Sequence, residues 1–152
     1  MTNTDFAFLA GHWTSHQRRL TKVLAGQDEW YEFTATLDSQ LLLDGACVFD
    51  VVRAPERDIE GITLRLYDPA EQVWRIWWAA KTSGGRLDAP VVGRFEGPVG
   101  RFECEDTWEG RPILVRYEWN RSDPGHPTWQ QSFSPDLGET WELNWAATFS
   151  RP

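Results

Sequence analysis

Histidine is the side chain in this sequence best suited to acid–base chemistry, because its ordinary pKa lies near neutrality. The chain contains His12, His16 and His126. One hypothesis is that His16 and Asp106 act as a proton-transferring pair, which requires both to reach one pocket. His12 and His16 are four residues apart, which would suit a metal ion on a helix. The local pattern instead predicts a strand, on which they would lie about 13 Å apart, so no metal site is predicted.

Other polar residues interrupt faces that are otherwise apolar. Asp106 continues an apolar face, Gln131 lies between two aromatic residues, and His16 and Arg18 share one phase of the first predicted strand, although a bulge there could shift that phase. Burying a polar group costs free energy unless the group is paired. These side chains therefore either pair with one another or face a wet cavity, and the sequence leaves both interpretations open.

The leading hypothesis is that the protein binds a small, largely apolar or aromatic molecule, since binding pockets are mostly apolar with a few convergent polar groups. The alternative is a cyclase, isomerase or hydrolase that uses His16 with Asp106, so the sequence leaves open whether the protein is an enzyme. No cofactor is predicted. The expected ligand-binding residues are His16, Arg18, Trp78, Asp106, Tyr117, Trp119, Trp129, Gln131 and Phe133.

Composition narrows the classes of partner. The 152 residues include ten Trp, and the formal net charge is −8. The aromatic content excludes disorder, and the acidity argues against nucleic acid and anionic membranes as partners. No secretory signal or membrane-length apolar run is visible, so a cytoplasmic location is expected. Cys47 and Cys104 lack metal-ligand spacing and are expected to be free thiols.

Turn signals recur about every 8 to 15 residues, which is typical of an all-β sandwich or barrel. Period-two alternation gives the strands one apolar face each. We therefore predict one domain over residues 1–152, a single up-and-down antiparallel β-barrel with a short helical turn over 5–10 capped by Thr4. The ten expected strands lie near 12–24, 29–38, 46–53, 61–67, 73–80, 90–96, 100–107, 112–120, 128–134 and 140–149.

Gly11-His12-Trp13, at the start of the first expected strand, resembles the opening signature of lipocalins and related calycins. In that family the Trp closes the barrel floor beneath a basic residue from the last strand, a part that Arg151 could play here. Related barrels that bind haem use a histidine on a late strand, whereas His126 lies in an expected loop. The resemblance thus implies a calycin-type barrel and argues against haem.

The resemblance extends to a bacterial family of lipocalin-like proteins of unknown function, and it brings no established activity. It covers most of the chain. The similar stretches are 6–13, 16, 18–20, 61–65, 67–69, 91–95, 110–113, 134–141 and 144–145.

Two further features concern turns and surfaces. Residues 134–141, Ser-Pro-Asp-Leu-Gly-Glu-Thr-Trp, match the Asp-box pattern known from sialidase propellers. One copy cannot build a propeller, so we interpret it as the hairpin joining the last two strands.

Trp30 and Trp77 fall on the phase opposite the expected core. They indicate a ligand platform or a homodimer surface.

Overall fold

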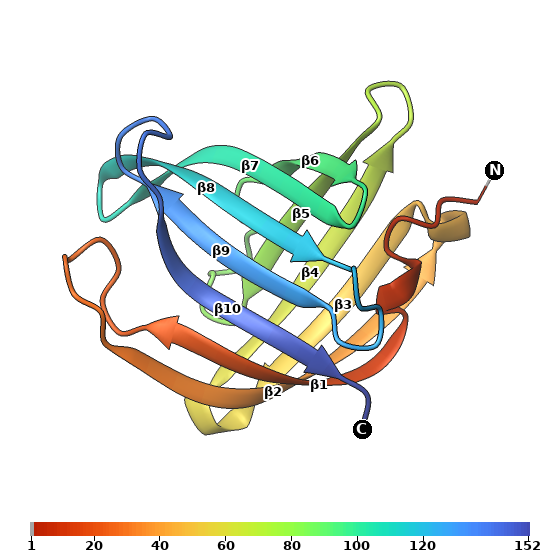
Figure 1. The fold of residues 1–152 in the computed structure, drawn as a ribbon, viewed down its shortest axis with the longest axis horizontal. Helices are drawn as coiled ribbons and strands as arrows, with labels where there is room; N and C mark the ends of the chain where they lie inside the picture. Colours follow the sequence, from red (N-terminus) through yellow and green to blue (C-terminus); the bar gives the residue numbers. More distant parts are fainter. Residues whose placement is uncertain (1) are drawn as a thin grey trace.

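Ten antiparallel strands close into a barrel in the computed structural model, which describes residues 2–152 (Figure 1). The fold predicted from the sequence is confirmed. The strands are β1 (Gly11–Leu20), β2 (Trp30–Leu42), β3 (Cys47–Ala54), β4 (Ile59–Asp68), β5 (Val73–Ala80), β6 (Val91–Glu96), β7 (Val99–Trp108), β8 (Arg111–Asn120), β9 (Thr128–Ser134) and β10 (Glu142–Ser150).

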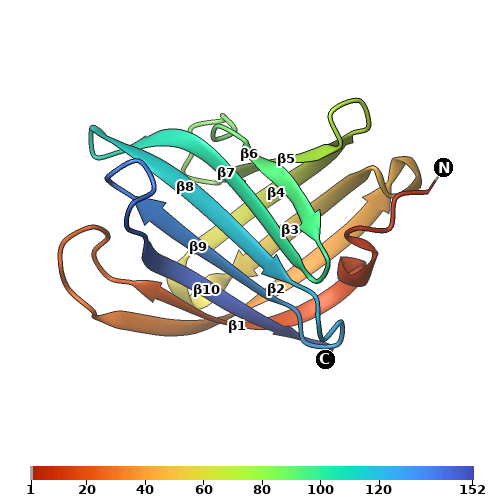
Figure 2. The same ribbon diagram turned by 45° about the horizontal axis from the view of Figure 1, so that its top comes forward.

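Each strand pairs with its neighbours in the sequence, and β1 also pairs with β10 to close the ring (Figure 2). Closure pairs the two outermost strands, β1 and β10, with each other, which is how such barrels limit edge-to-edge aggregation. The shortest seam joins β5 to β6, where Trp74, Arg75 and Ile76 pair with residues 91–93. Beyond Ile76, β5 continues toward the open end of the barrel without a partner on β6.

Three short 3-10 helices complete the structure: η1 (Ala7–Leu9), η2 (Leu43–Gly45) and η3 (Pro55–Arg57). Among residues 2–152, no helix is long and apolar enough to cross a membrane. The first helix lies where the helical turn was predicted. The expectation that the Thr4 side chain caps this helix is wrong, because no side-chain cap hydrogen bond forms. The Thr4 backbone carbonyl instead accepts a hydrogen bond from Ala7 N at 3.1 Å.

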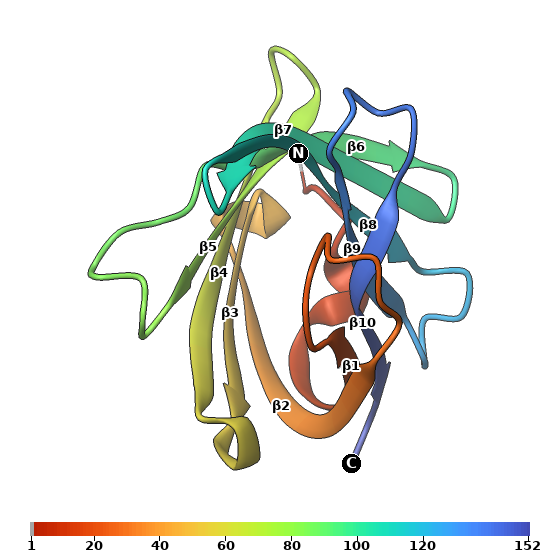
Figure 3. The same cartoon turned by 90° about the vertical axis from the view of Figure 1, so that its left-hand side faces the viewer.

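The N-terminal segment closes one end of the barrel. We call residues 6–9 the plug, because Phe6 and Leu9 are fully buried in the main hydrophobic cluster. Figure 3 looks into the opposite, open end, with the plug (red) behind the ring of strands. The barrel is therefore a cup with one accessible end.

The predicted contact between Trp13 and Arg151 is confirmed. The Arg151 guanidinium carbon lies 3.6 Å from the centroid of the Trp13 ring, and its two terminal nitrogens donate to the His12 and Ala10 carbonyls. The Trp13 indole N–H donates to Leu9 O at 2.9 Å. The Trp thus ties the plug to β1 while the Arg covers it from outside.

The Asp-box segment forms the β9–β10 hairpin, as predicted. Ser134 Oγ accepts from Gly138 N at 2.7 Å, and the Asp136 carboxylate accepts from Thr140 N at 2.8 Å and from Thr140 Oγ1 at 2.5 Å. The Thr140 hydrogen bonds hold the pKa of Asp136 below its usual range. Gly138 has φ +91, a conformation that side chains disfavour. The segment makes a turn and supplies no reactive group to the cavity.

The outer wall over β3, β4 and β5 carries half-buried apolar side chains. Trp77 lies there opposite Leu64, whereas Trp30 lies on β2 beneath the Arg18 guanidinium at 4.5 Å. Two strands separate β2 from β5, so Trp30 and Trp77 do not form one continuous surface. The half-buried apolar residues of this outer wall are Phe49, Val51, Ile62, Leu64, Leu66, Trp77 and Ala79.

Candidate functional site

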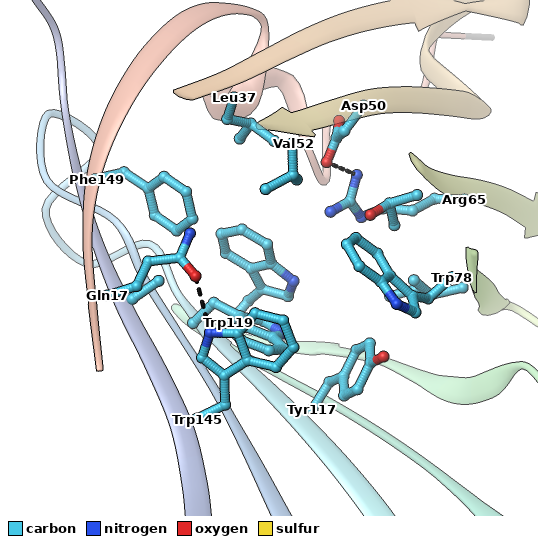
Figure 4. A pocket seen from close by; sticks show the side chains of 14 residues that line it. Gln17, Leu37, Asp50, Val52, Arg65, Trp78, Tyr117, Trp119, Trp145 and Phe149 are labelled. Atoms are coloured by element: carbon cyan, nitrogen blue, oxygen red, sulfur yellow. Dashed lines mark hydrogen bonds and ion pairs between the residues drawn. The ribbon is translucent and has the colours of Figure 1, made fainter. Parts of the chain in front are cut away.

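The barrel encloses a cavity of about 60 Å³ between the plug and the open end (Figure 4). Six aromatic side chains contribute to its wall, and one ion pair lies within the wall. We call this space the inner cavity. Its lining residues are Gln17, Leu37, Asp50, Val52, Thr63, Arg65, Ile76, Trp78, Tyr117, Trp119, Trp129, Trp145, Ala147 and Phe149.

The ion pair joins Arg65 on β4 to Asp50 on β3. Arg65 Nη1 lies 2.6 Å from Asp50 Oδ2, and the two side chains are only 3% and 1% exposed. Ser39 Oγ donates to the other carboxylate oxygen at 2.6 Å. Charges this deeply buried are tolerated only when they are paired and hydrogen-bonded. The pair therefore adds a polar group with no net charge to a mostly apolar cavity.

Two tryptophans separate the inner cavity from the open end. Trp78 and Trp145 meet edge to face, with centroids 6.3 Å apart, and Arg19 lies over Trp145 at 4.1 Å. The Trp145 indole N–H donates to Gln17 Oε1 at 2.8 Å, which fixes its ring. Gly61 gives Trp78 its place, because a Cβ on Gly61 would lie 2.3 Å from the Trp78 indole. We call the two tryptophans the gate.

Outside the gate lies a second space of about 290 Å³, which we call the vestibule. Asp88 and Asp106 contribute two carboxylates to it and Arg19 one cation. Partial burial, with the Asp106 charge adding to it, raises the pKa of Asp88 above its ordinary value. The vestibule residues are Arg19, Trp78, Asp88, Asp106, Thr107, Trp108, Ile113, Gln131, Phe133 and Trp145.

Tyr117 lines the inner cavity, and charges of both signs influence the pKa of its phenol. Burial raises the pKa of its phenol, the Asp88 carboxylate raises it further, and the Arg65 guanidinium lowers it. The net shift is upward, so the hydroxyl stays protonated at neutral pH. It can therefore donate a hydrogen bond within the cavity.

Cys104, on β7 near the vestibule, is expected to be an unreactive thiol. Burial raises its pKa from 9.0 to about 11, with Asp106 and Asp88 adding to the shift. Only the thiolate reacts with disulfides. At pH 8 the native protein should therefore react about 100-fold more slowly at this position than the unfolded chain. Absorbance from an aromatic disulfide reagent, with and without urea, measures both rates.

A Cys104→Ser variant separates this thiol from Cys47, which is also free. The folded pKa of Cys104 is the higher one, so its contribution to stability is present below about pH 9 and is lost as pH rises toward 11. Fast labelling of native Cys104 at pH 8 would contradict the expectation.

The structure places seven of the nine expected ligand-binding residues around these two spaces. Trp78, Tyr117, Trp119 and Trp129 line the inner cavity. The vestibule is lined by Asp106, Gln131 and Phe133, together with Trp78. Gln131 also donates to Asn144 Oδ1 at 2.8 Å, so it is partly engaged. That these side chains bind a ligand stays a prediction.

The expectation that His16 and Arg18 line the cavity is wrong. Strand β1 runs without a bulge, pairing from Gly11 to Leu20 with β2, so the phase of the buried Trp13 continues unbroken. His16 lies on the outer wall, 60% exposed, with Nε2 2.9 Å from the Glu32 carboxylate. Arg18 is also outside, where it lies over Trp30. The acid–base pair of His16 with Asp106 does not form, because the barrel wall separates them.

The remaining histidines lie on the surface. His12 Nδ1 is 2.7 Å from Asp38 on the outer wall, and His126 lies in the β8–β9 loop beside Asp123. Within residues 2–152, no group of three or more His, Cys, Asp or Glu side chains could hold a metal ion.

Sequence reasoning missed Gln17, Asp50 and Arg65 as cavity residues. The signal for Gln17 was present, because it shares the phase of Trp13 on β1. For Arg65 the alternation pointed the wrong way. The apolar phase of β4 lies half-buried on the outer wall, while the phase that holds Thr63 and Arg65 turns inward. Only the pairing of β3 with β4 shows that Asp50 supplies the opposite charge.

These observations define a closed ten-stranded antiparallel barrel with an aromatic interior and one buried ion pair. Comparison of the chain with protein-family models and with curated proteins finds no match. The resemblance to bacterial lipocalin-like proteins therefore stays a prediction.

Proposed function

We propose that the protein binds a small aromatic molecule inside the barrel. The observation that carries the proposal is the wall of the inner cavity, where four tryptophans, Tyr117 and Phe149 surround one space. Such a surface favours flat apolar ligands through burial and ring contacts.

The size of the cavity limits the ligand. A cavity of about 150 Å³ holds benzene, whereas the inner cavity is about 60 Å³. A ligand with one ring must therefore extend past the gate into the vestibule of about 290 Å³. Movement of Trp78 or Trp145 would join the two spaces. The proposal thus specifies a ligand of one or two rings and excludes long-chain lipids.

The gate gives a variant that tests the proposal without removing any cavity side chain. Gly61→Ala places a methyl group where the Trp78 indole lies, so the indole must move toward the barrel axis and narrow the passage. We expect toluene binding to weaken by about tenfold, equivalent to about 1.4 kcal/mol. The overpacking should also lower the free energy of unfolding by about 1–3 kcal/mol. Titration followed by indole ¹H–¹⁵N resonances measures the affinity.

Thr34→Ala, an exposed change on the outer face of β2, is the matched control and should leave the affinity unchanged. If toluene shifts no indole resonance of the unsubstituted protein, the proposal fails. Equal affinity for the protein and the Gly61→Ala variant would show that the gate does not control access.

Location and self-association stay predictions. The two free cysteines support a reducing, cytoplasmic environment. The apolar outer wall around Trp77 supports a homodimer, and light scattering tests it. Neither property is needed for the cavity to bind a ligand.

A further inference from the structure

Arg65 has a hydrogen-bond donor that no protein group uses. Its Nη1 is paired with Asp50, yet its Nε–H is buried with no hydrogen-bond partner among residues 2–152. Leaving a buried donor of a charged group unpaired is costly. Because Arg65 lines the inner cavity, a ligand that enters this cavity could supply the missing hydrogen-bond acceptor.

Trp119 has a second hydrogen-bond donor that no protein group uses. Its indole N–H is also buried without a partner, whereas the Trp13, Trp74 and Trp145 indoles each donate to a protein oxygen. The Arg65 guanidinium carbon lies 5.5 Å from the centroid of the Trp119 ring. Both side chains line the inner cavity, where Figure 4 shows them as neighbours.

The charges around the two donors select against an anionic ligand. Asp50 already neutralises Arg65 at 2.6 Å, and no other charged side chain lines the inner cavity within the described chain. A ligand carboxylate would add a second negative charge there without a counter-ion, which is costly at this depth. The vestibule adds Asp88 and Asp106 against Arg19 alone, so it also disfavours anions.

We propose that Arg65 and Trp119 together bind the hydrogen-bond acceptor of an uncharged aromatic ligand, a carbonyl oxygen or a ring nitrogen. The acceptor occupies the inner cavity, and the ring passes between Trp78 and Trp145. This inference rests on the proposed function and specifies the ligand class of the same site.

Three probes of nearly equal shape test the inference at pH 7. Acetophenone carries a carbonyl oxygen, α-methylstyrene replaces that oxygen with a methylene group, and benzoate replaces the acetyl group with a carboxylate. We expect acetophenone to bind at least about tenfold more tightly than either of the others, the ratio typical of a hydrogen bond to a charged group. Indole ¹H–¹⁵N spectra give the three affinities, and acetophenone alone should shift the Trp119 indole proton downfield.

Trp119→Phe assigns the Trp119 resonance and keeps an aromatic ring while removing the N–H. It should reduce the preference for acetophenone over α-methylstyrene several-fold, whereas Trp77→Phe on the outer wall should leave the preference unchanged. If the Trp119 variant does not fold, the probe series on the unsubstituted protein still decides. Equal binding of acetophenone and α-methylstyrene overturns the acceptor site but supports the cavity. Tighter binding of benzoate overturns the uncharged class, and binding of none of the probes overturns both proposals.

Discussion

Replacement of Asp50 by asparagine is expected to lower the free energy of unfolding by about 3–5 kcal/mol. The change keeps the shape of the side chain and removes only its charge. Arg65 would then be a cation, 3% exposed, with no counter-ion. Arginine cannot relieve this by releasing its proton, so the whole desolvation cost falls on the folded state. Urea unfolding followed by tryptophan fluorescence measures the loss.

A double replacement, Asp50→Leu with Arg65→Met, separates the effect of the charge from that of packing. Buried ion pairs exchanged together for apolar residues of similar volume are often neutral or stabilising. The double variant should therefore be more stable than Asp50→Asn, although it loses the proposed acceptor site. A cost below about 1 kcal/mol for Asp50→Asn would mean that Arg65 escapes to solvent when its partner is removed.

Replacement of Phe6 by alanine should cost about 3–5 kcal/mol of unfolding free energy, as expected for a fully buried phenylalanine. The Phe6 ring is the centre of the plug. It lies 4.9 Å from Trp74, 5.0 Å from Phe95 and 6.0 Å from Phe102 between ring centroids. It also lies 5.0 Å from the Arg65 guanidinium carbon. Its loss leaves a cavity directly beneath the ion pair.

Phe8→Ala is the matched control, because Phe8 belongs to the same segment but is only half-buried. It should cost clearly less than Phe6→Ala in the same urea titration. Neither residue belongs to a strand, so a difference between the two unfolding free energies measures the burial of each ring within the plug. Equal costs would contradict the central position given to Phe6.

The ten strands could be predicted from the sequence because turn residues separate short runs of strand formers. Residues 134–141 could likewise be assigned to a hairpin, since their side chains bond to the local backbone. The contact of Trp13 with Arg151 was also predictable, although it came from the family resemblance rather than from spacing. The strands and the hairpin depend on residues that are close in the sequence. The contact of Trp13 with Arg151 depends on a motif known from the family that the sequence resembles.

The candidate site was only partly predictable. Tyr117 and Trp119 follow the regular alternation of β8, whose apolar phase points inward. On β4 the same rule fails, because its inner phase holds Arg65 while its outer phase is apolar. On β1, a bulge that the strand does not contain would have been needed to bring His16 inside.

Alternation in the sequence by itself determined that each strand has two faces, and turn chemistry determined where the strands end. The tertiary structure alone decided which face of β4 is inside. A charged residue is stable in the interior only where a neighbouring strand supplies the opposite charge. The pairing of β3 with β4 brings Asp50 to Arg65 across 15 positions of chain. No local sequence pattern predicts this ion pair, and the proposed recognition of an uncharged acceptor depends on the pair.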